Sequence, residues 1–180
     1  MQAGKIENRH SAAYHAGGVR KKIDTIIRKI RPEEHDFLRE FLYQDIYFPE
    51  GVEPPPRSVV DLPELQVYIA DFGTRPGDPC LVVEAGEKVV GAAWCRIMED
   101  YGHIDNDTPS LAISLLPKYR GHGTGTQLLN GLLLLLREYG YQQASLSVQR
   151  ENPALHLYER TGFQILEEKD TEYLMLWDST

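Results

Sequence analysis

Three glycines at alternate positions are the residues whose spacing most clearly suggests chemistry. Gly121, Gly123 and Gly125 follow the apolar stretch 111–116 and lead into a leucine-rich stretch. Alternate glycines permit positive φ angles and remove Cβ atoms, so successive backbone N–H groups can point into one concavity. A helix that starts there adds the positive end of its dipole. These glycines could simply form a tight turn, but with Arg120 beside them they favour an anion site suited to a pyrophosphate.

The spacing narrows the choice of phosphate ligand. A nucleotide-binding P-loop needs Lys and then Ser or Thr after its last glycine, whereas Thr126 and Gln127 follow Gly125 here. The dinucleotide pattern GxGxxG also fails, because the spacing is GxGxG. Glu151 follows the next expected strand, where a ribose-binding acid would lie, so a dinucleotide site stays open. The hairpin expected before the glycines argues against that alternative.

Hydrophobic periodicity predicts the elements that position this loop. Alternating or β-rich segments predict strands at 24–30, 80–85, 89–98, 111–116, 144–148, 163–168 and 172–177. Helical spacing predicts helices at 33–43, 62–72, 125–139 and 153–160. Five prolines at 49–63 predict an irregular loop, either a substrate lid or a surface insertion. This order indicates a mixed sheet with helices.

Two linked motifs resemble those of the GNAT-type N-acetyltransferases. Residues 120–125 match the pattern [QR]-x-x-G-x-[GA] between a strand and a helix. Residues 148–163 resemble the family's second signature through Asn152, Ala154, Tyr158, Gly162 and Phe163. The resemblance covers about 23–177 and leaves a basic extension, 1–22, outside the expected domain, 23–180.

The resemblance implies an α/β (mixed α+β) acyl-CoA N-acyltransferase fold. Its central sheet would be mostly antiparallel, flanked by helices, and splayed apart between strands 111–116 and 144–148. Acetyl-CoA, or another acyl-CoA, would be the donor, with no metal. The protein would then be an N-acetyltransferase acting on an amine by direct attack in a ternary complex, and a homodimer is a further expectation.

The resemblance also implies roles for individual residues. The backbone of Leu115 would pair with the pantetheine arm and polarise the thioester carbonyl, and Asn152 would bind the arm. Tyr158 would act as the general acid, which suits a phenol of pKa about 10 beside a thiolate whose conjugate acid has a pKa of about 8.5. As one of ten tyrosines, it could instead only pack. The implied cofactor-binding residues are Leu115, Leu116, Arg120, Gly121, His122, Gly123, Thr124, Gly125, Thr126, Asn152 and Tyr158.

The general base is harder to assign, because the stretch 111–116 contains no carboxylate. Glu99 and Asp105 are the base candidates, with His103 and Asp107 in the same expected loop. A water relay, or an acceptor that arrives as the neutral amine, remains an alternative.

The distribution of charge along the chain limits the classes of molecule that the protein is expected to bind. The net charge of -8 is unevenly spread: residues 1–31 carry eight basic and two acidic side chains, and the other 149 carry 11 basic and 25 acidic ones. A body this acidic repels nucleic acid and anionic membranes. It favours a cationic small-molecule or peptide amine, whose pocket could include Phe41, Tyr43, Tyr47 and Phe48, or these could be core. The competing hypothesis is a non-catalytic acyl-CoA-binding regulatory module.

The compartment is expected to be cytoplasmic. Cys80 and Cys95 lack the spacing of a zinc site, and we expect them to be two reduced thiols. The first residues contain no apolar segment typical of a secretory signal. The longest apolar run, 132–136, is far shorter than the roughly 18 residues of a membrane span.

Overall fold

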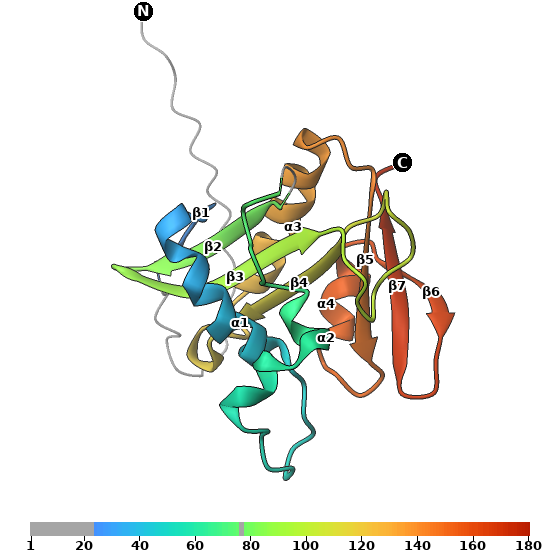
Figure 1. Ribbon diagram of the computed structural model, residues 1–180, viewed down its shortest axis with the longest axis horizontal. Coiled ribbons are helices and arrows are strands. Elements are labelled where there is room, and N and C mark those ends of the chain that lie inside the picture. The colour runs from blue at the N-terminus through green and yellow to red at the C-terminus, as the bar shows by residue number, and fades with distance from the viewer. Residues whose placement is uncertain (1–23, 76–77) are drawn as a thin grey trace, which may run out of the picture.

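A seven-stranded sheet forms the centre of the molecule in the computed structural model, which describes residues 24–75 and 78–180 (Figure 1). Its strands lie in the order β1-β2-β3-β4-β5-β7-β6. Every neighbouring pair is antiparallel except β4 and β5, which are parallel. The predicted mixed, mostly antiparallel sheet is thus confirmed, while the expected extension, 1–22, lies outside the described residues. The strands are β1 Ile26–Lys29, β2 Cys80–Ala85, β3 Lys88–Arg96, β4 Ser110–Leu115, β5 Gln143–Gln149, β6 Gln164–Glu168 and β7 Glu172–Asp178.

The sheet opens in its middle, as expected. β4 and β5 pair at one position, Ser110 with Ser145, where the Ser145 N–H donates to the Pro109 carbonyl over 3.0 Å. Side-chain hydrogen bonds stabilise this junction of β4 and β5. The Ser110 hydroxyl donates to Asp100 over 2.7 Å, and the Tyr68 hydroxyl donates to the same carboxylate over 2.8 Å. Beyond it the two strands separate, so each has an unpaired edge facing the gap.

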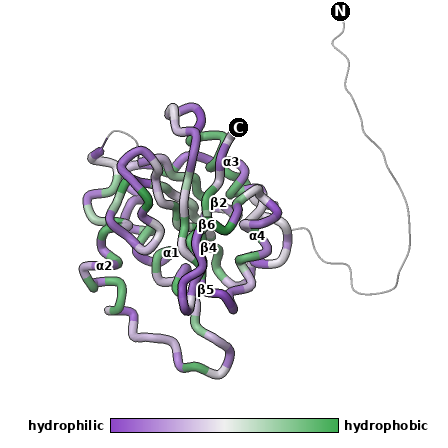
Figure 2. The backbone as a smooth tube through the Cα atoms, turned by 90° about the vertical axis from the view of Figure 1, so that its right-hand side faces the viewer, coloured by the Kyte–Doolittle hydropathy of each residue, from purple (hydrophilic) through white to green (hydrophobic). Residues whose placement is uncertain are grey.

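Helices cover both faces of the sheet (Figure 2). On one face lie α1 (Leu38–Asp45), which continues from a 3-10 turn at Pro32–Phe37, and the short α2 (Pro63–Gln66). On the other lie α3 (Thr124–Glu138) and α4 (Leu155–Arg160). Each face has its own apolar core. α3 contributes its core side chains as a helical stripe: Leu128, Leu129, Leu132, Leu133, Leu135 and Leu136.

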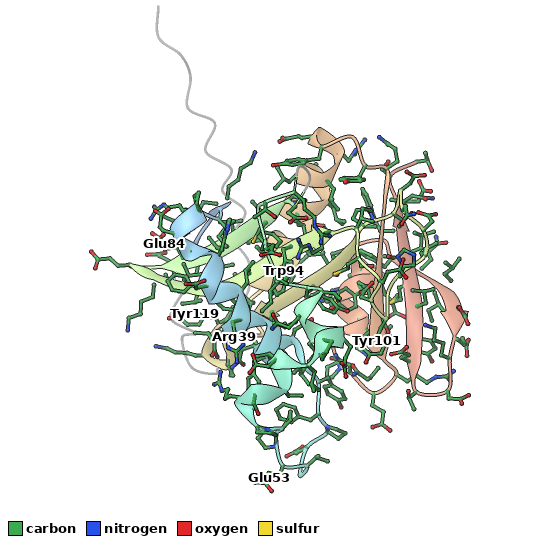
Figure 3. The ribbon with its side chains drawn as sticks, in the orientation of Figure 1. Arg39, Glu53, Glu84, Trp94, Tyr101 and Tyr119 are labelled. Atoms are coloured by element: carbon green, nitrogen blue, oxygen red, sulfur yellow. The ribbon has the colours of Figure 1, made fainter. Side chains whose placement is uncertain are left out.

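The helix predicted at 62–72 is shorter than expected, because side chains of β3 bind its carbonyl groups. α2 ends at Gln66, and turns follow to residue 73. Buried Arg96 donates to the carbonyls of Val67 and Ala70 over 3.2 and 2.8 Å, and buried Trp94 donates to that of Tyr68 over 3.0 Å (Trp94 in Figure 3). These long-range bonds replace the regular helical ones.

The proline-rich loop contains a 3-10 turn, Arg57–Asp61, and lies against α1. The Tyr43 hydroxyl donates to the Pro55 carbonyl over 2.7 Å, and Arg39 binds Asp61 over 2.9 Å. Glu53 projects at the outer end of this loop (Figure 3).

Candidate active site

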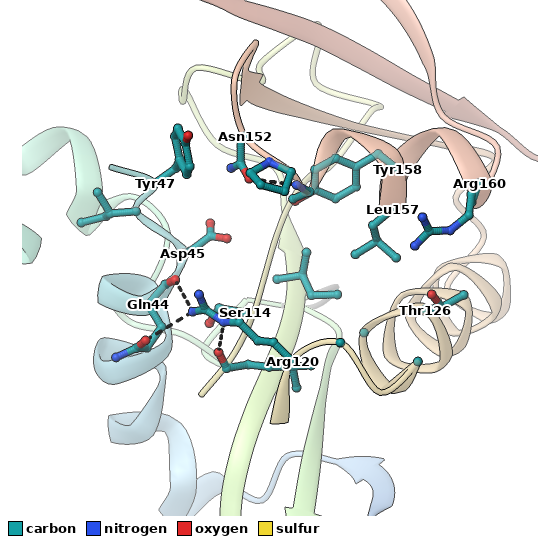
Figure 4. Close-up of a pocket in the computed structure, with 18 of the residues that line it drawn as sticks. Gln44, Asp45, Tyr47, Ser114, Arg120, Thr126, Asn152, Leu157, Tyr158 and Arg160 are labelled. Atoms are coloured by element: carbon teal, nitrogen blue, oxygen red, sulfur yellow. Dashed lines mark hydrogen bonds between the residues drawn. The ribbon is translucent and has the colours of Figure 1, made fainter. Parts of the chain in front are cut away.

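A cavity of about 690 Å³ lies beside β4, where β4 and β5 separate (Figure 4). The end of α1, the last half of β4, the glycine loop with the start of α3, and the start of α4 form its wall. Its lining residues are Gln44, Asp45, Ile46, Tyr47, Phe48, Ile113, Ser114, Leu115, Arg120, Gly121, Gly123, Gly125, Thr126, Asn152, Pro153, Ala154, Leu157, Tyr158 and Arg160. None of residues 49–63 lines the cavity, so the structure gives no support to the lid alternative for the proline-rich loop.

The open edge of β4 presents backbone groups to this cavity. The Leu116 N–H donates to the Val90 carbonyl of β3 over 2.9 Å. Because backbone groups of successive residues point to opposite edges of a strand, those of Ile113 and Leu115 point away from β3 and into the gap. An extended molecule with amide groups could pair there as a strand would.

The glycine loop has the conformation that its spacing predicts. Gly121 and Gly123 have φ angles of +75° and +82°, which side-chain-bearing residues rarely adopt. Gly123 is the N-cap of α3, and the first bond of the helix runs from the Gln127 N–H to the Gly123 carbonyl. The N–H groups of the first helical turn therefore have no partner within the helix, and they carry the positive end of its dipole.

Most of the expected cofactor-binding residues line the cavity: Leu115, Arg120, Gly121, Gly123, Gly125, Thr126, Asn152 and Tyr158. Three do not. Leu116 packs against both apolar cores, His122 is exposed at the loop surface, and Thr124, the first residue of α3, is buried.

The Arg120 side chain points to the end of α1. Its Nε donates to the Leu115 carbonyl over 2.7 Å, and its Nη2 donates to the carbonyl and side-chain oxygens of Gln44 over 3.2 and 3.3 Å (Figure 4). Its guanidinium thus joins the glycine loop to the opposite wall of the cavity.

Tyr158 lies on α4, with its ring buried and edge-on to Phe163 at 5.9 Å between centroids. Within the described residues its hydroxyl has no hydrogen-bond partner, and it faces the cavity. Burial, with a smaller contribution from the charge of Asp45, raises its pKa above the usual range. The phenol therefore stays protonated at neutral pH and can donate.

Asn152 shapes the turn that leads into α4. Its side-chain oxygen accepts a hydrogen bond of 2.9 Å from the Ala154 N–H. This leaves its amide nitrogen for the cavity, which Asn152 lines.

The structure places neither Glu99 nor Asp105 in the cavity wall. The Glu99 side chain is 85% exposed and lines a separate hollow beside Met98. Asp105 accepts hydrogen bonds from the N–H groups of Asp107 and Thr108 over 2.9 and 2.8 Å, which lower its pKa. It therefore orders its own loop.

Sequence reasoning missed two charged residues of the cavity, Asp45 and Arg160. Asp45 ends α1, and burial raises the pKa of its carboxyl to about 7. The only local signal was an acid two residues beyond the predicted helix 33–43, just before Tyr47 and Phe48. Those two aromatics line the cavity, whereas Phe41 belongs to the core.

A family model for the acetyltransferase (GNAT) family matches residues 38–163, which include all parts of the cavity wall. The chain belongs to the GNAT acetyltransferase family.

Two curated relatives match part of the chain. Ribosomal protein bS18-alanine N-acetyltransferase from Haemophilus influenzae is 34% identical over 86 residues, which cover 48% of this chain and 55% of that protein. Mycothiol acetyltransferase from Propionibacterium freudenreichii is 32% identical over 84 residues, covering 46% of this chain and 26% of that protein. The matches thus span about half of the first relative and a quarter of the second.

Solved structures of GNAT acetyltransferases share the fold. PaiA N-acetyltransferase from Thermoplasma acidophilum, solved with coenzyme A, has a TM-score of 0.63 at 19% identity, covering 86% of this chain and 99% of that one. A GNAT-family acetyltransferase from Streptococcus pneumoniae gives 0.63 at 20% identity, covering 87% and 100%. The acyl-CoA N-acyltransferase fold expected from the sequence is thereby confirmed.

Two further features concern the described residues only. None of their helices is long and apolar enough to cross a membrane. Their His, Cys, Asp and Glu side chains form no group of three that could hold a metal ion.

Proposed function

We propose that this GNAT protein transfers an acetyl group from acetyl-CoA to a primary amine by direct attack in a ternary complex. The observation that carries the proposal is one continuous cavity. It joins the glycine loop before α3, an unpaired strand edge and a buried phenol.

The donor would lie along the wall from the glycine loop to α4. The N–H groups of the loop and of the first turn of α3 would bind the pyrophosphate, with Arg160 at the same wall as an added cation. The edge of β4 at Ile113 and Leu115 would pair with the amides of the pantetheine arm, and Asn152 would bind the arm from the other side. Each of these groups fits acetyl-CoA, which supplies the activated thioester.

The chemistry follows from this placement. The acceptor nitrogen attacks the thioester carbon, and the carbonyl oxygen becomes an oxyanion that a β4 N–H can stabilise by about 3 kcal/mol. As the tetrahedral intermediate collapses, the C–S bond breaks and its electron pair goes to sulfur. Tyr158 gives its proton to that sulfur, which leaves as the thiol.

The acceptor would enter from the wall formed by the end of α1, where Tyr47 and Phe48 line the cavity. One of the two relatives is named for N-acetylation of an alanine of ribosomal protein bS18, and the other for acetylation in the mycothiol series. A primary amine on a peptide or a small molecule is therefore the acceptor class that we propose.

The test has two stages. Acetyl-CoA is expected to raise the melting temperature of the full chain, and NAD is expected to leave it unchanged. A shift with NAD alone would contradict the proposal and favour the dinucleotide site.

Release of free CoA is then measured with four amines: spermidine, glucosamine, Nα-acetyl-lysine and a hexapeptide with a free N-terminal alanine. At least one is expected to give turnover above the rate without amine. The non-catalytic acyl-CoA-binding module would be favoured by tight acetyl-CoA binding with no turnover for any amine. In that case Tyr158→Phe would also leave the rate of CoA release unchanged.

A further inference from the structure

One carboxylic acid faces the cavity, from the wall opposite α4. Among the described residues that line the cavity, Asp45 is the only Asp or Glu. Its carboxylate accepts a hydrogen bond from the backbone of Ile113, on the open edge of β4. Tyr158 projects toward the cavity from the other side (Figure 4). The acid thus lies beside the strand edge where the thioester would bind, across from the proton donor.

Two bonds hold the end of α1 on β4 and so fix this acid. The Ser114 hydroxyl donates to the Phe41 carbonyl over 2.6 Å, one turn before Asp45. Arg120 donates to the Gln44 carbonyl, the residue next to Asp45, while it also binds β4. A cation at the last carbonyls of a helix suits the negative end of its dipole. The last turn of α1 is therefore clamped to the strand that would bind the thioester.

Burial makes Asp45 a stronger base than an ordinary carboxylate, and the polar and charged groups beside it oppose part of this effect. Burial raises its pKa to about 7, while the Ile113 hydrogen bond and the charge of Arg120 hold it below what burial alone would give. Tyr158 from α4 and Tyr68 from the segment after α2 are the other titratable groups near it. Burial raises the pKa of both, and the charge of Asp45 adds a smaller contribution to each. An acid of this kind is about half ionised at pH 7, and its ionised form can accept a proton from an ammonium group.

We propose that Asp45 is the general base that takes a proton from the acceptor ammonium, and that Arg120 positions it. This inference rests on the proposed acetyl transfer. The ammonium gives one proton to Asp45, which passes it to water, and the freed lone pair forms the C–N bond. When the C–S bond breaks, Tyr158 protonates the sulfur. The proton that leaves the new amide nitrogen restores Tyr158, so the products are the amide, free CoA and one proton.

Asp45→Asn tests the base. At pH 7, with the amine that wild type acetylates fastest among the four probes, kcat/KM is expected to fall at least about 100-fold. The acidic limb of the pH profile is expected to disappear, and the Kd for acetyl-CoA is expected to change less than about threefold. Asp45→Glu is expected to restore part of the rate, since it keeps the carboxylate. Asp36→Asn, an exposed acid in the turn before α1, is the matched control and is expected to behave as wild type.

Arg120 is tested by the position of the acidic limb. Arg120→Gln removes a positive charge near Asp45, so it is expected to raise the pKa of Asp45 and move the limb of kcat/KM to higher pH. Arg120→Lys keeps the charge and is expected to leave the limb in place while kcat falls. A merely structural Arg120 would lower the rate of both variants without moving the limb in either, and that result would overturn its assignment.

Two results would overturn the role of Asp45. One is an Asp45→Asn variant within about threefold of wild type that keeps its acidic limb. The other is a ¹³C-detected titration of the Asp45 carboxyl, in the protein saturated with acetyl-CoA, that falls in the usual aspartate range near 4. The titration needs no acceptor, so it remains informative if no amine gives turnover. The absence of turnover with every amine would count against the proposed acetyl transfer itself, and not against the raised pKa of Asp45.

Discussion

A single hydroxyl shows how much of this site depends on environment rather than on residue type. The sequence contains ten tyrosines, and only the motif around Tyr158 distinguishes it. In the structure its ring is buried against Phe163 while its hydroxyl faces the cavity. Asp45 is the opposite case. Nothing in the spacing along the chain distinguishes it from the other acids. Its environment in the cavity includes Ile113 and Arg120, which are far away in sequence.

Replacing Tyr158 with Phe is expected to lower kcat about 10²- to 10⁴-fold, because the thiolate loses its proton donor. The ring remains, so packing and the Kd for acetyl-CoA are expected to stay near wild type. Because the pKa of Tyr158 is raised, its loss of a proton is not expected to limit the wild-type rate below pH 10. Steady-state CoA release and calorimetric binding measure the two parts. Tyr173→Phe, away from the cavity, serves as the control, and an unchanged kcat in Tyr158→Phe would exclude the acid role.

The elements could be predicted where local rules decide them. The hairpin of β2 and β3, the glycine turn into α3 and the Asn-Pro turn before α4 each have a local cause, and all three occur. The segment after α2 could not be predicted as it is, because Arg96 and Trp94 of β3 bind its carbonyls. The 3-10 turn before α1 is likewise held by a distant contact.

That contact is an ion cluster that joins the turn to β1 and β2. Arg28 donates to both oxygens of Glu34 over 2.6 and 2.7 Å and to Glu84 over 2.8 Å, and the Arg31 N–H donates to Glu34 over 2.9 Å. The Glu34 side chain is only 9% exposed. The hydrogen bonds from Arg28 lower its pKa from 4.5 to about 2. Glu34 therefore ties the edge strand to the helical layer.

The pH dependence of stability follows from this lowered pKa. The stabilisation by Glu34 is complete above its unfolded-state pKa of 4.5 and is lost as the pH falls toward 2, and the shift corresponds to about 3 kcal/mol. Glu34→Gln is expected to be less stable at pH 7 by about that amount, with a smaller further loss on acidification. Urea unfolding between pH 2.5 and 7 measures both. The neighbouring exposed Glu33→Gln is the control, and parallel curves for wild type and Glu34→Gln would refute the assignment.

For the whole molecule, the two motifs were enough to predict a mostly antiparallel sheet flanked by helices, with a gap between strands 111–116 and 144–148. They were not enough to predict that the end of α1 forms one wall of the cavity. α1 reaches that place through Ser114 and Arg120, contacts of a kind that leave no periodic signal in a sequence. Eight of the eleven expected cofactor-binding residues line the cavity, whereas the expected base candidates, Glu99 and Asp105, lie elsewhere.

The single pair that joins β4 to β5 also bears on how the protein behaves without a donor. Strands β1–β4 and β5–β7 form two halves of a sheet that are joined at Ser110 and Ser145 and separate beyond that pair. In the free protein, the amide hydrogen of Leu115 is expected to exchange with solvent faster than those of Ala112 and Ser114, which face β3. Pantetheine alone, without the nucleotide, is expected to slow the exchange of Leu115 selectively, as measured by hydrogen–deuterium exchange. Equal protection of Leu115, Ala112 and Ser114 in the free protein would contradict this. If Leu115 is protected as expected, the bound pantetheine arm takes the place of a further strand in the gap. The sheet would then be continuous only while that arm is bound.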